Sequence, residues 1–133
     1  WVGGGTNHRM GLYDAILIKE NHIAAAGGVA AVLAQAARSA PQAKFVEIEV
    51  ERLDQLHEAL DNGARMVLLD NMDLPTLREA VRINAGRAIL EVSGGVTIDT
   101  VAALAQTGVD RISIGGLTKD VKATDYSMRF EGI

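Results

Sequence analysis

A short stretch near the start of the chain combines consecutive glycines with cationic side chains. It runs Gly3-Gly4-Gly5-Thr6-Asn7-His8-Arg9, and Lys19 follows at the end of the apolar run Ile16-Leu17-Ile18. Glycines let a backbone turn tightly and approach a ligand closely, and Arg9 and Lys19 carry the charge that binds carboxylates and phosphates. The pattern predicts an anion-binding site, and a glycine-rich turn with solvated charges is the plainer alternative. The sequence is equally compatible with an acid–base role and a structural role for His8. For His22 we favour a structural role.

Carboxylates follow two later apolar runs. In the stretch from Phe45 to Glu51, Glu47 and Glu49 share one face of an alternating strand, opposite Val46, Ile48 and Val50. That face either meets solvent or points into a barrel, where like charges need partners. Asp70 ends the run Met66-Val67-Leu68-Leu69. Glu49 and Asp70 are suited to binding sugar hydroxyls, holding a divalent cation or stabilising a cationic transition state, and the sequence leaves these roles open.

Two glycine turns follow the last two apolar runs. They are Ser93-Gly94-Gly95 and Ile114-Gly115-Gly116. Exposed backbone N–H groups in such turns can form a phosphate cradle, helped by the positive end of a helix expected to start near Thr97 and to carry Ile98 on its apolar side. The alternative is that both turns need glycine for conformation alone.

Alternating strands and helices must position these groups. We expect strands at 14–19, 45–51, 66–71, 88–93 and 111–116, and helices at 29–38, around Leu53 to Leu60, from Asp73 to Asn84, from Thr97 to Gly108 and near 124–129. This order predicts an α/β fold of parallel βα units, with four to five helices. Parallel strands bring their polar ends to one rim, here Lys19, Glu49, Asp70, Ser93 and Gly115. Five strands are too few for a closed (β/α)8 barrel, so we expect a partial, open TIM-like barrel or an open sheet.

The composition restricts the partners. The chain has 133 residues, enough for one domain, and a net charge of −4 without a run of Lys or Arg, so we expect no nucleic acid partner. No apolar run is long enough to cross a membrane. The absence of cysteine excludes disulfides and thiolate–zinc sites and fits a cytoplasmic protein.

These motifs together resemble quinolinate phosphoribosyltransferases, also called nicotinate-nucleotide pyrophosphorylases (carboxylating). The resemblance rests on the glycine triplet with His8-Arg9 and on five further runs that occur in the family's order. These are Leu17-Ile18-Lys19-Glu20-Asn21-His22, Val46 to Glu51, Leu68-Leu69-Asp70-Asn71, Glu91-Val92-Ser93-Gly94-Gly95 and Ile112-Ser113-Ile114-Gly115-Gly116-Leu117-Thr118.

The resemblance implies a reaction of NAD biosynthesis. Quinolinate and phosphoribosyl pyrophosphate (PRPP) would give nicotinate mononucleotide, pyrophosphate and CO2, with Mg²⁺. It also implies that His8, Arg9 and Lys19 meet quinolinate and that Glu49 and Asp70 lie at the ribose. The phosphate would lie against Ser93, Gly94, Gly95, Ile114, Gly115 and Gly116.

The chain also departs from the family pattern. An N-terminal α/β domain, an Arg-Lys motif before the glycine triplet and the first barrel strands are expected in the family and are missing from residues 1–133. The family works as a homodimer or larger assembly, with an arginine supplied by the partner. We therefore expect a C-terminal barrel portion that is inactive alone. The alternatives are a non-catalytic phosphate-binding fragment and a molybdenum-associated paralogue of the same fold.

Overall fold

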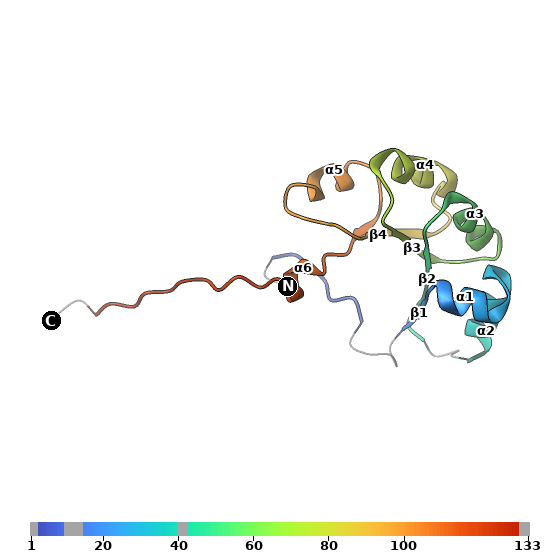
Figure 1. The fold of residues 1–133 in the computed structure, drawn as a ribbon, viewed down its shortest axis with the longest axis horizontal. Coiled ribbons are helices and arrows are strands. Elements are labelled where there is room, and N and C mark those ends of the chain that lie inside the picture. The colour runs from blue at the N-terminus through green and yellow to red at the C-terminus, as the bar shows by residue number, and fades with distance from the viewer. Residues whose placement is uncertain (1–2, 10–14, 40–42, 131–133) are drawn as a thin grey trace.

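The computed structural model describes residues 3–9, 15–39 and 43–130. Five parallel strands form one curved sheet in the order β1-β2-β3-β4-β5. Figure 1 shows helices α1 to α5 along the outer side of this curve and α6 apart from them, where the chain leaves the sheet. The strands are β1 (Ile16–Ile18), β2 (Val46–Val50), β3 (Met66–Asp70), β4 (Ile89–Ser93) and β5 (Arg111–Ile112). The helices are α1 (Glu20–Ala26), α2 (Val29–Ser39), α3 (Leu53–Asp61), α4 (Leu74–Asn84), α5 (Val101–Ala105) and α6 (Gly116–Lys119).

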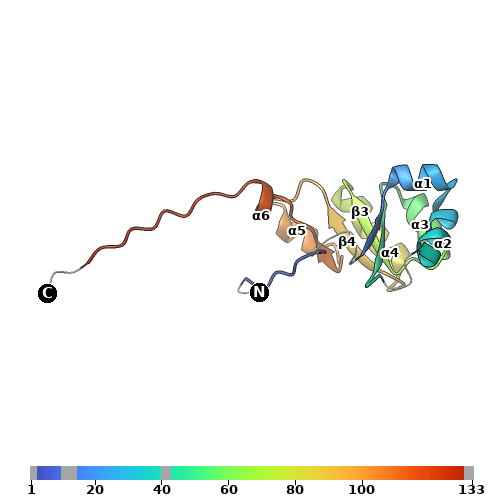
Figure 2. The same cartoon turned by 90° about the horizontal axis from the view of Figure 1, so that it is seen from below.

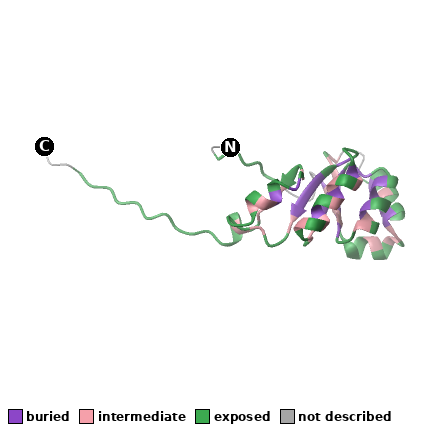
Figure 3. Ribbon diagram, turned by 90° about the horizontal axis from the view of Figure 1, so that it is seen from above, coloured by how far each residue is buried: buried purple, intermediate pink, exposed green. Residues whose placement is uncertain are grey.

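The hydrophobic core lies between the outer face of the sheet and the helices. Alternate residues of the central strands, such as Ile48 and Leu69, are fully buried there against helix residues such as Leu56 and Leu77. Figure 3 shows this burial concentrated in the strands and on the inward sides of the helices. Because successive strand residues point to opposite faces, the intervening positions of β2, β3 and β4 face the concave side. The expected partial α/β barrel is thereby confirmed.

Local sequence signals set the helix ends. Asp73 caps α4, since its carboxylate accepts a hydrogen bond from the Thr76 N–H at 2.9 Å, and Pro75 occupies the first turn. Gly63, at φ 78°, follows α3 in the left-handed conformation that ends helices. The buried Asn84 joins the end of α4 to the start of β4 through hydrogen bonds to both the carbonyl and the N–H of Ala88.

The structure corrects several expectations. Strand β5 covers Arg111–Ile112 instead of 111–116, and Gly116–Lys119 form the additional helix α6, so the described residues contain six helices where four to five were expected. Residues Glu20–Ala26 form the additional helix α1, and residues 124–129 are extended instead of helical. Helix α5 begins at Val101 instead of near Thr97, and the residues between them form a turn in which the Thr97 carbonyl accepts hydrogen bonds from the N–H groups of Thr100 and Val101. Ile98, expected on the buried face of that helix, is 86% exposed.

The last part of the described chain leaves the barrel. Residues 121–130 run outward as an extended segment, which is clear in Figures 1 and 2. Its large apolar side chains, including Tyr126 and Phe130, are exposed. Across the described residues, the structure contains no helix with the length and apolarity to span a membrane.

Candidate functional site

An ion pair connects the ends of the first two strands. Lys19 directly follows β1, and its Nζ lies 3.6 Å from Oε2 of Glu49 on β2. The register of β1 and β2 pairs Ile18 with Ile48, which brings the next residues of both strands to the same edge. The Lys19 side chain is half exposed and that of Glu49 is mostly buried. The cation is therefore available to a ligand, while the carboxylate is held in place.

A second carboxylate adds negative charge beside this pair. Asp70 ends β3, and its charge raises the pKa of Glu49. The main cause of that raised pKa is burial of the Glu49 carboxylate, and the charge of Lys19 acts in the opposite direction. Two neighbouring carboxylates with one lysine form a site that favours a positively charged group.

The ends of β3 and β4 are held together by a tight backbone approach. Asp70 pairs with Ser93, and the Asn71 N–H donates to the Ser93 carbonyl at 3.2 Å. Gly94 has φ 92°, and a Cβ placed there would lie 3.2 Å from the Asn71 nitrogen and 3.4 Å from Oδ1 of Asp70. Only glycine satisfies both the conformation and the contact, so this turn brings bare backbone next to Asp70.

The two glycine turns are neighbours at this edge. The Ser113 N–H donates to the Val92 carbonyl at 2.9 Å, which holds the segment after β5 against the end of β4. Gly95 has φ 61°, whereas Gly115 has φ −67° and caps the short helix α6. Within the described part of the chain, the N–H groups of Gly94 and Gly95 donate to no other backbone group. They are therefore available to an anion.

The N-terminal residues lie elsewhere. His8 Nε2 is 2.9 Å from Oε2 of Glu47, which lies further down the concave face of β2, and 3.9 Å from Oε1 of Glu91 on β4. Arg9 donates from Nη1 to the Ala15 carbonyl at 3.1 Å, before the start of β1. Lys19, Glu49 and Asp70 are thus brought together, and His8 and Arg9 lie apart from them.

His22 has the structural role that its sequence favoured. Its Nδ1 accepts a hydrogen bond from the Lys19 N–H at 3.0 Å and so fixes the start of α1. The strand edge therefore depends on His22 for the position of the Lys19 backbone.

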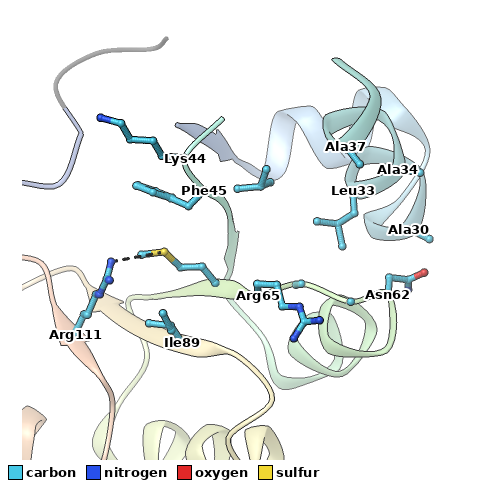
Figure 4. A pocket seen from close by; sticks show the side chains of 14 residues that line it. Ala30, Leu33, Ala34, Ala37, Lys44, Phe45, Asn62, Arg65, Ile89 and Arg111 are labelled. Atoms are coloured by element: carbon cyan, nitrogen blue, oxygen red, sulfur yellow. Dashed lines mark hydrogen bonds between the residues drawn. The ribbon is translucent and has the colours of Figure 1, made fainter. Parts of the chain in front are cut away.

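A cleft of about 760 Å³ lies at the other end of the strands (Figure 4). Small apolar residues of α2 such as Ala30, Leu33 and Ala37 form one wall, and Phe45 and Ile89, at the starts of β2 and β4, form another. Figure 4 shows that its lining is mainly aliphatic, with Arg65 and Arg111 at its margins. It lacks the convergent acid and base groups of the opposite edge, where parallel α/β folds bind their ligands.

The chain matches a family model along almost all of its length. Residues 1–129 match the model described as quinolinate phosphoribosyl transferase, C-terminal domain. The chain belongs to the quinolinate phosphoribosyl transferase family. The family match includes every residue that forms the strand edge described above, from Lys19 to Gly116.

Individual relatives agree with this assignment. The chain is 42% identical over 127 residues to the probable nicotinate-nucleotide pyrophosphorylase (carboxylating) of Bacillus subtilis, covering 96% of this chain and 44% of the relative. It is 41% identical to quinolinate phosphoribosyltransferase (decarboxylating) 2b of Nicotiana tabacum, covering 98% of this chain and 42% of that protein. The crystal structure of NadC from Streptococcus pyogenes superposes with a TM-score of 0.91 at 43% identity, over 97% of this chain and 45% of that one. The chain thus spans less than half the length of these members of the quinolinate phosphoribosyl transferase family.

Two carboxylates on the concave face of the sheet, Glu47 and Glu91, received no role from the sequence. Glu47 and Glu91 are 0% and 3% exposed, although both are charged residue types that rarely occur fully buried. For Glu47 the alternation of its strand gave a signal, and the structure confirms the inward-pointing alternative. For Glu91 the signal was a lone carboxylate within the apolar run Ile89 to Val92.

The burial of Glu47 makes stability depend on pH. Burial is the largest cause that raises the pKa of Glu47 above 4.5, and the His8 hydrogen bond opposes it. Above about pH 4.5, the folded protein therefore keeps a proton that the unfolded chain has lost, and the free energy of unfolding falls as pH rises towards the native pKa. One proton gives a slope of at most about 1.4 kcal/mol per pH unit. Urea unfolding in metal-free buffer at several pH values should show this decline, and Glu47→Gln should remove it. An equal decline in the variant would contradict the assignment to Glu47.

Proposed function

We propose that this chain supplies the phosphoribosyl-transfer edge of an enzyme that converts quinolinate and PRPP to nicotinate mononucleotide, pyrophosphate and CO2. The observation that carries the proposal is a coincidence of two findings. The family match runs through residues 1–129, and within it Lys19, Glu49, Asp70 and Gly94 gather at the carboxyl edge of one parallel sheet.

The acidic pair suits the charge that develops in this reaction. When pyrophosphate leaves C1 of the ribose, the sugar becomes oxocarbenium-like and positively charged. We assign Glu49 and Asp70 to that position, where their fixed negative charge stabilises the cation more than the neutral ground state. Their ionised carboxylates also accept hydrogen bonds from the ribose hydroxyls.

The glycine turns are assigned to the phosphate of the ribosyl group. Gly94 and Gly95 offer backbone N–H groups directly beside Asp70, so the phosphate and the ribose would be held on adjacent strands. Ser93 adds a hydroxyl donor at the end of β4. Ile114, Gly115 and Gly116 extend the same surface from β5, and this part of the proposal rests on the family resemblance.

Quinolinate is a dianion and needs cations at fixed positions. We assign Lys19 to one of its carboxylates because its ammonium group lies at the edge and is half exposed. Arg9 and His8 are proposed as further quinolinate ligands from the resemblance alone, since their side chains contact Ala15 and Glu47 in this structure. After the ring nitrogen bonds to C1 of the ribose, it carries positive charge that favours loss of the adjacent carboxylate as CO2. The electron pair left on that ring carbon then takes up a proton from solvent.

We propose Mg²⁺ as the metal that accompanies PRPP. The hard carboxylate oxygens of Glu49 and Asp70 suit this ion, and it would neutralise the departing pyrophosphate. We further propose that the enzyme is a cytoplasmic homodimer or larger assembly without a nucleic acid partner, as the cysteine-free, acidic sequence and the family resemblance favour.

A phosphate-binding module without catalysis is the second candidate. The position of Arg9 favours this candidate. The Arg9 guanidinium contacts the Ala15 carbonyl, so of the two cations proposed to bind quinolinate carboxylates, Lys19 lies at the strand edge and Arg9 does not. Such a module would bind ribose 5-phosphate and PRPP but would not bind quinolinate.

Product analysis tests the proposal. The full-length protein that carries this sequence, given quinolinate, PRPP and Mg²⁺, should form nicotinate mononucleotide, CO2 and pyrophosphate in equal amounts. Nicotinate should not replace quinolinate as the acceptor. PRPP binding without any product would support the second candidate instead, and product formed equally well from nicotinate would contradict the assigned substrate.

A further inference from the structure

The middle of the concave face holds two buried carboxylates whose polar contacts among the described residues are few. Glu47 on β2 and Glu91 on β4 come from alternate strands, the arrangement that brings barrel side chains into one layer. Oε1 of Glu47 is buried and has no hydrogen-bond partner among the described residues. The Glu91 side chain is 4% exposed, and its one close polar contact in the described chain is His8 Nε2 at 3.9 Å. Buried charges of this kind are normally paired or coordinate a metal.

We propose that His8, Glu47 and Glu91 form a binding site for a divalent transition-metal ion of the Zn²⁺ or Mn²⁺ class. Their ligand atoms all lie within 4.8 Å of one another. Two ligands of a tetrahedral ion at ~2.1 Å are about 3.4 Å apart, and Nε2 of His8 lies 2.9 Å from Oε2 of Glu47 and 3.9 Å from Oε1 of Glu91, on either side of that separation. One imidazole and two carboxylates favour such ions over Mg²⁺, which prefers oxygen ligands alone.

The surroundings leave room for the ion. A cleft of about 270 Å³, lined by residues that include Thr6, His8, Glu91 and Ser113, leads to this cluster from solvent. Arg111 is paired with Glu91 in the strand register. However, its guanidinium donates to the sulfur of Met66 at 3.8 Å (dashed line in Figure 4) instead of to a carboxylate. The orphaned oxygen of Glu47 thus remains available to a metal.

This site shares no residue with the phosphoribosyl edge, and its one overlap with the proposed quinolinate ligands is His8, so metal binding is measured without quinolinate. Glu47 precedes Glu49 by two residues on the same face of β2, so it lies one side-chain layer below the pair formed with Lys19. The proposal therefore stands whether or not the protein turns over quinolinate.

Calorimetric titration with Zn²⁺ alone tests the proposal. The full-length protein should bind one equivalent with a dissociation constant below about 10 μM, weaker than sites with four protein ligands. Glu47→Gln and His8→Ala should each raise that constant at least about ten-fold. His8 lies outside the strands and helices, so His8→Ala leaves every strand residue in place where a change at Glu47 does not, and thermal unfolding checks that the variant is folded. Glu51→Gln, an exposed change next to β2, is the matched control and should leave the constant within about two-fold.

Two results would overturn the metal site. Absence of Zn²⁺ binding would mean that Glu47 and Glu91 hold a proton or a cationic side chain instead. An equal loss of affinity in Glu51→Gln would mean that the ion binds nonspecifically to acidic surface groups.

Discussion

Lys19→Ala should lower kcat/KM for quinolinate by at least about 10²-fold, because it removes the cation assigned to a substrate carboxylate. The fold should survive. The Lys19 side chain is half exposed, and its contact is the 3.6 Å ion pair with Glu49, which contributes at most about 1 kcal/mol at such exposure. Steady-state kinetics with both substrates, together with thermal unfolding, would measure the two effects separately.

The matched control for this change is Lys122→Ala. Lys122 carries the same charge in the exposed segment that leaves the barrel, so its loss should change kcat/KM by less than about two-fold. Lys19→Arg keeps the charge but changes its geometry, and it should recover part of the lost activity. If Lys19→Ala kept the activity of the parent protein, Lys19 would have no role in binding quinolinate.

Gly94→Val should raise the dissociation constant for PRPP at least about ten-fold. Valine is strained at φ 92°, and its Cβ would meet the Asn71 nitrogen at 3.2 Å. Relief of that contact requires the turn after β4 to move away from Asp70, which displaces the N–H groups assigned to the phosphate. Isothermal titration with PRPP would measure the loss of affinity for the substrate. The same titration with ribose 5-phosphate, which lacks the pyrophosphate, would measure the loss of affinity at the 5-phosphate.

Gly86→Val is the control that separates the effect of backbone strain from the loss of the phosphate site at Gly94. Gly86 also has a left-handed φ, of 76°, but a Cβ there would meet nothing within 4 Å, and the residue follows α4 far from the strand ends. Both variants should lose roughly 1–3 kcal/mol of stability, while Gly86→Val should bind PRPP as the parent does. Unchanged PRPP affinity in Gly94→Val would remove the phosphate from this turn.

The strands were predictable because they repeat the same buried pattern. Runs such as Met66-Val67-Leu68-Leu69 are apolar throughout, as expected for parallel strands covered on both faces, and each ends in a polar residue or glycine. The strand order then brings Lys19 to Glu49 and Asp70 to Ser93 without further information. The central part of the candidate site therefore follows from spacing alone.

The errors arise where helices lack a buried face. Helix α1 has no buried residue, so its sequence shows no apolar stripe, and its polar start was interpreted as part of the strand end. The helix expected near 124–129 is also absent, and the apolar side chains of that segment, such as Tyr126, remain exposed. A helix this short has little stability without tertiary packing.

The N-terminal residues were the least predictable part of the site. The glycine triplet and His8 lie outside the sheet, so no strand register determines their position. The contact between His8 and Glu47 spans 39 residues of sequence and joins a segment without secondary structure to the middle of β2. Sequence indicated the chemistry of these groups but could not indicate that His8 would contact buried carboxylates.

A crystal structure of the full-length protein with PRPP and Mg²⁺ tests the central claim most directly, because it locates both phosphate-bearing ends of the ligand. We expect the 5-phosphate against the backbone of Gly94 and Gly95, with the ribose beside Glu49 and Asp70. PRPP bound in the aliphatic cleft between α2 and the starts of β2 and β4, or bound away from the ends of β3 and β4, would contradict the assignment of this edge as the phosphoribosyl site.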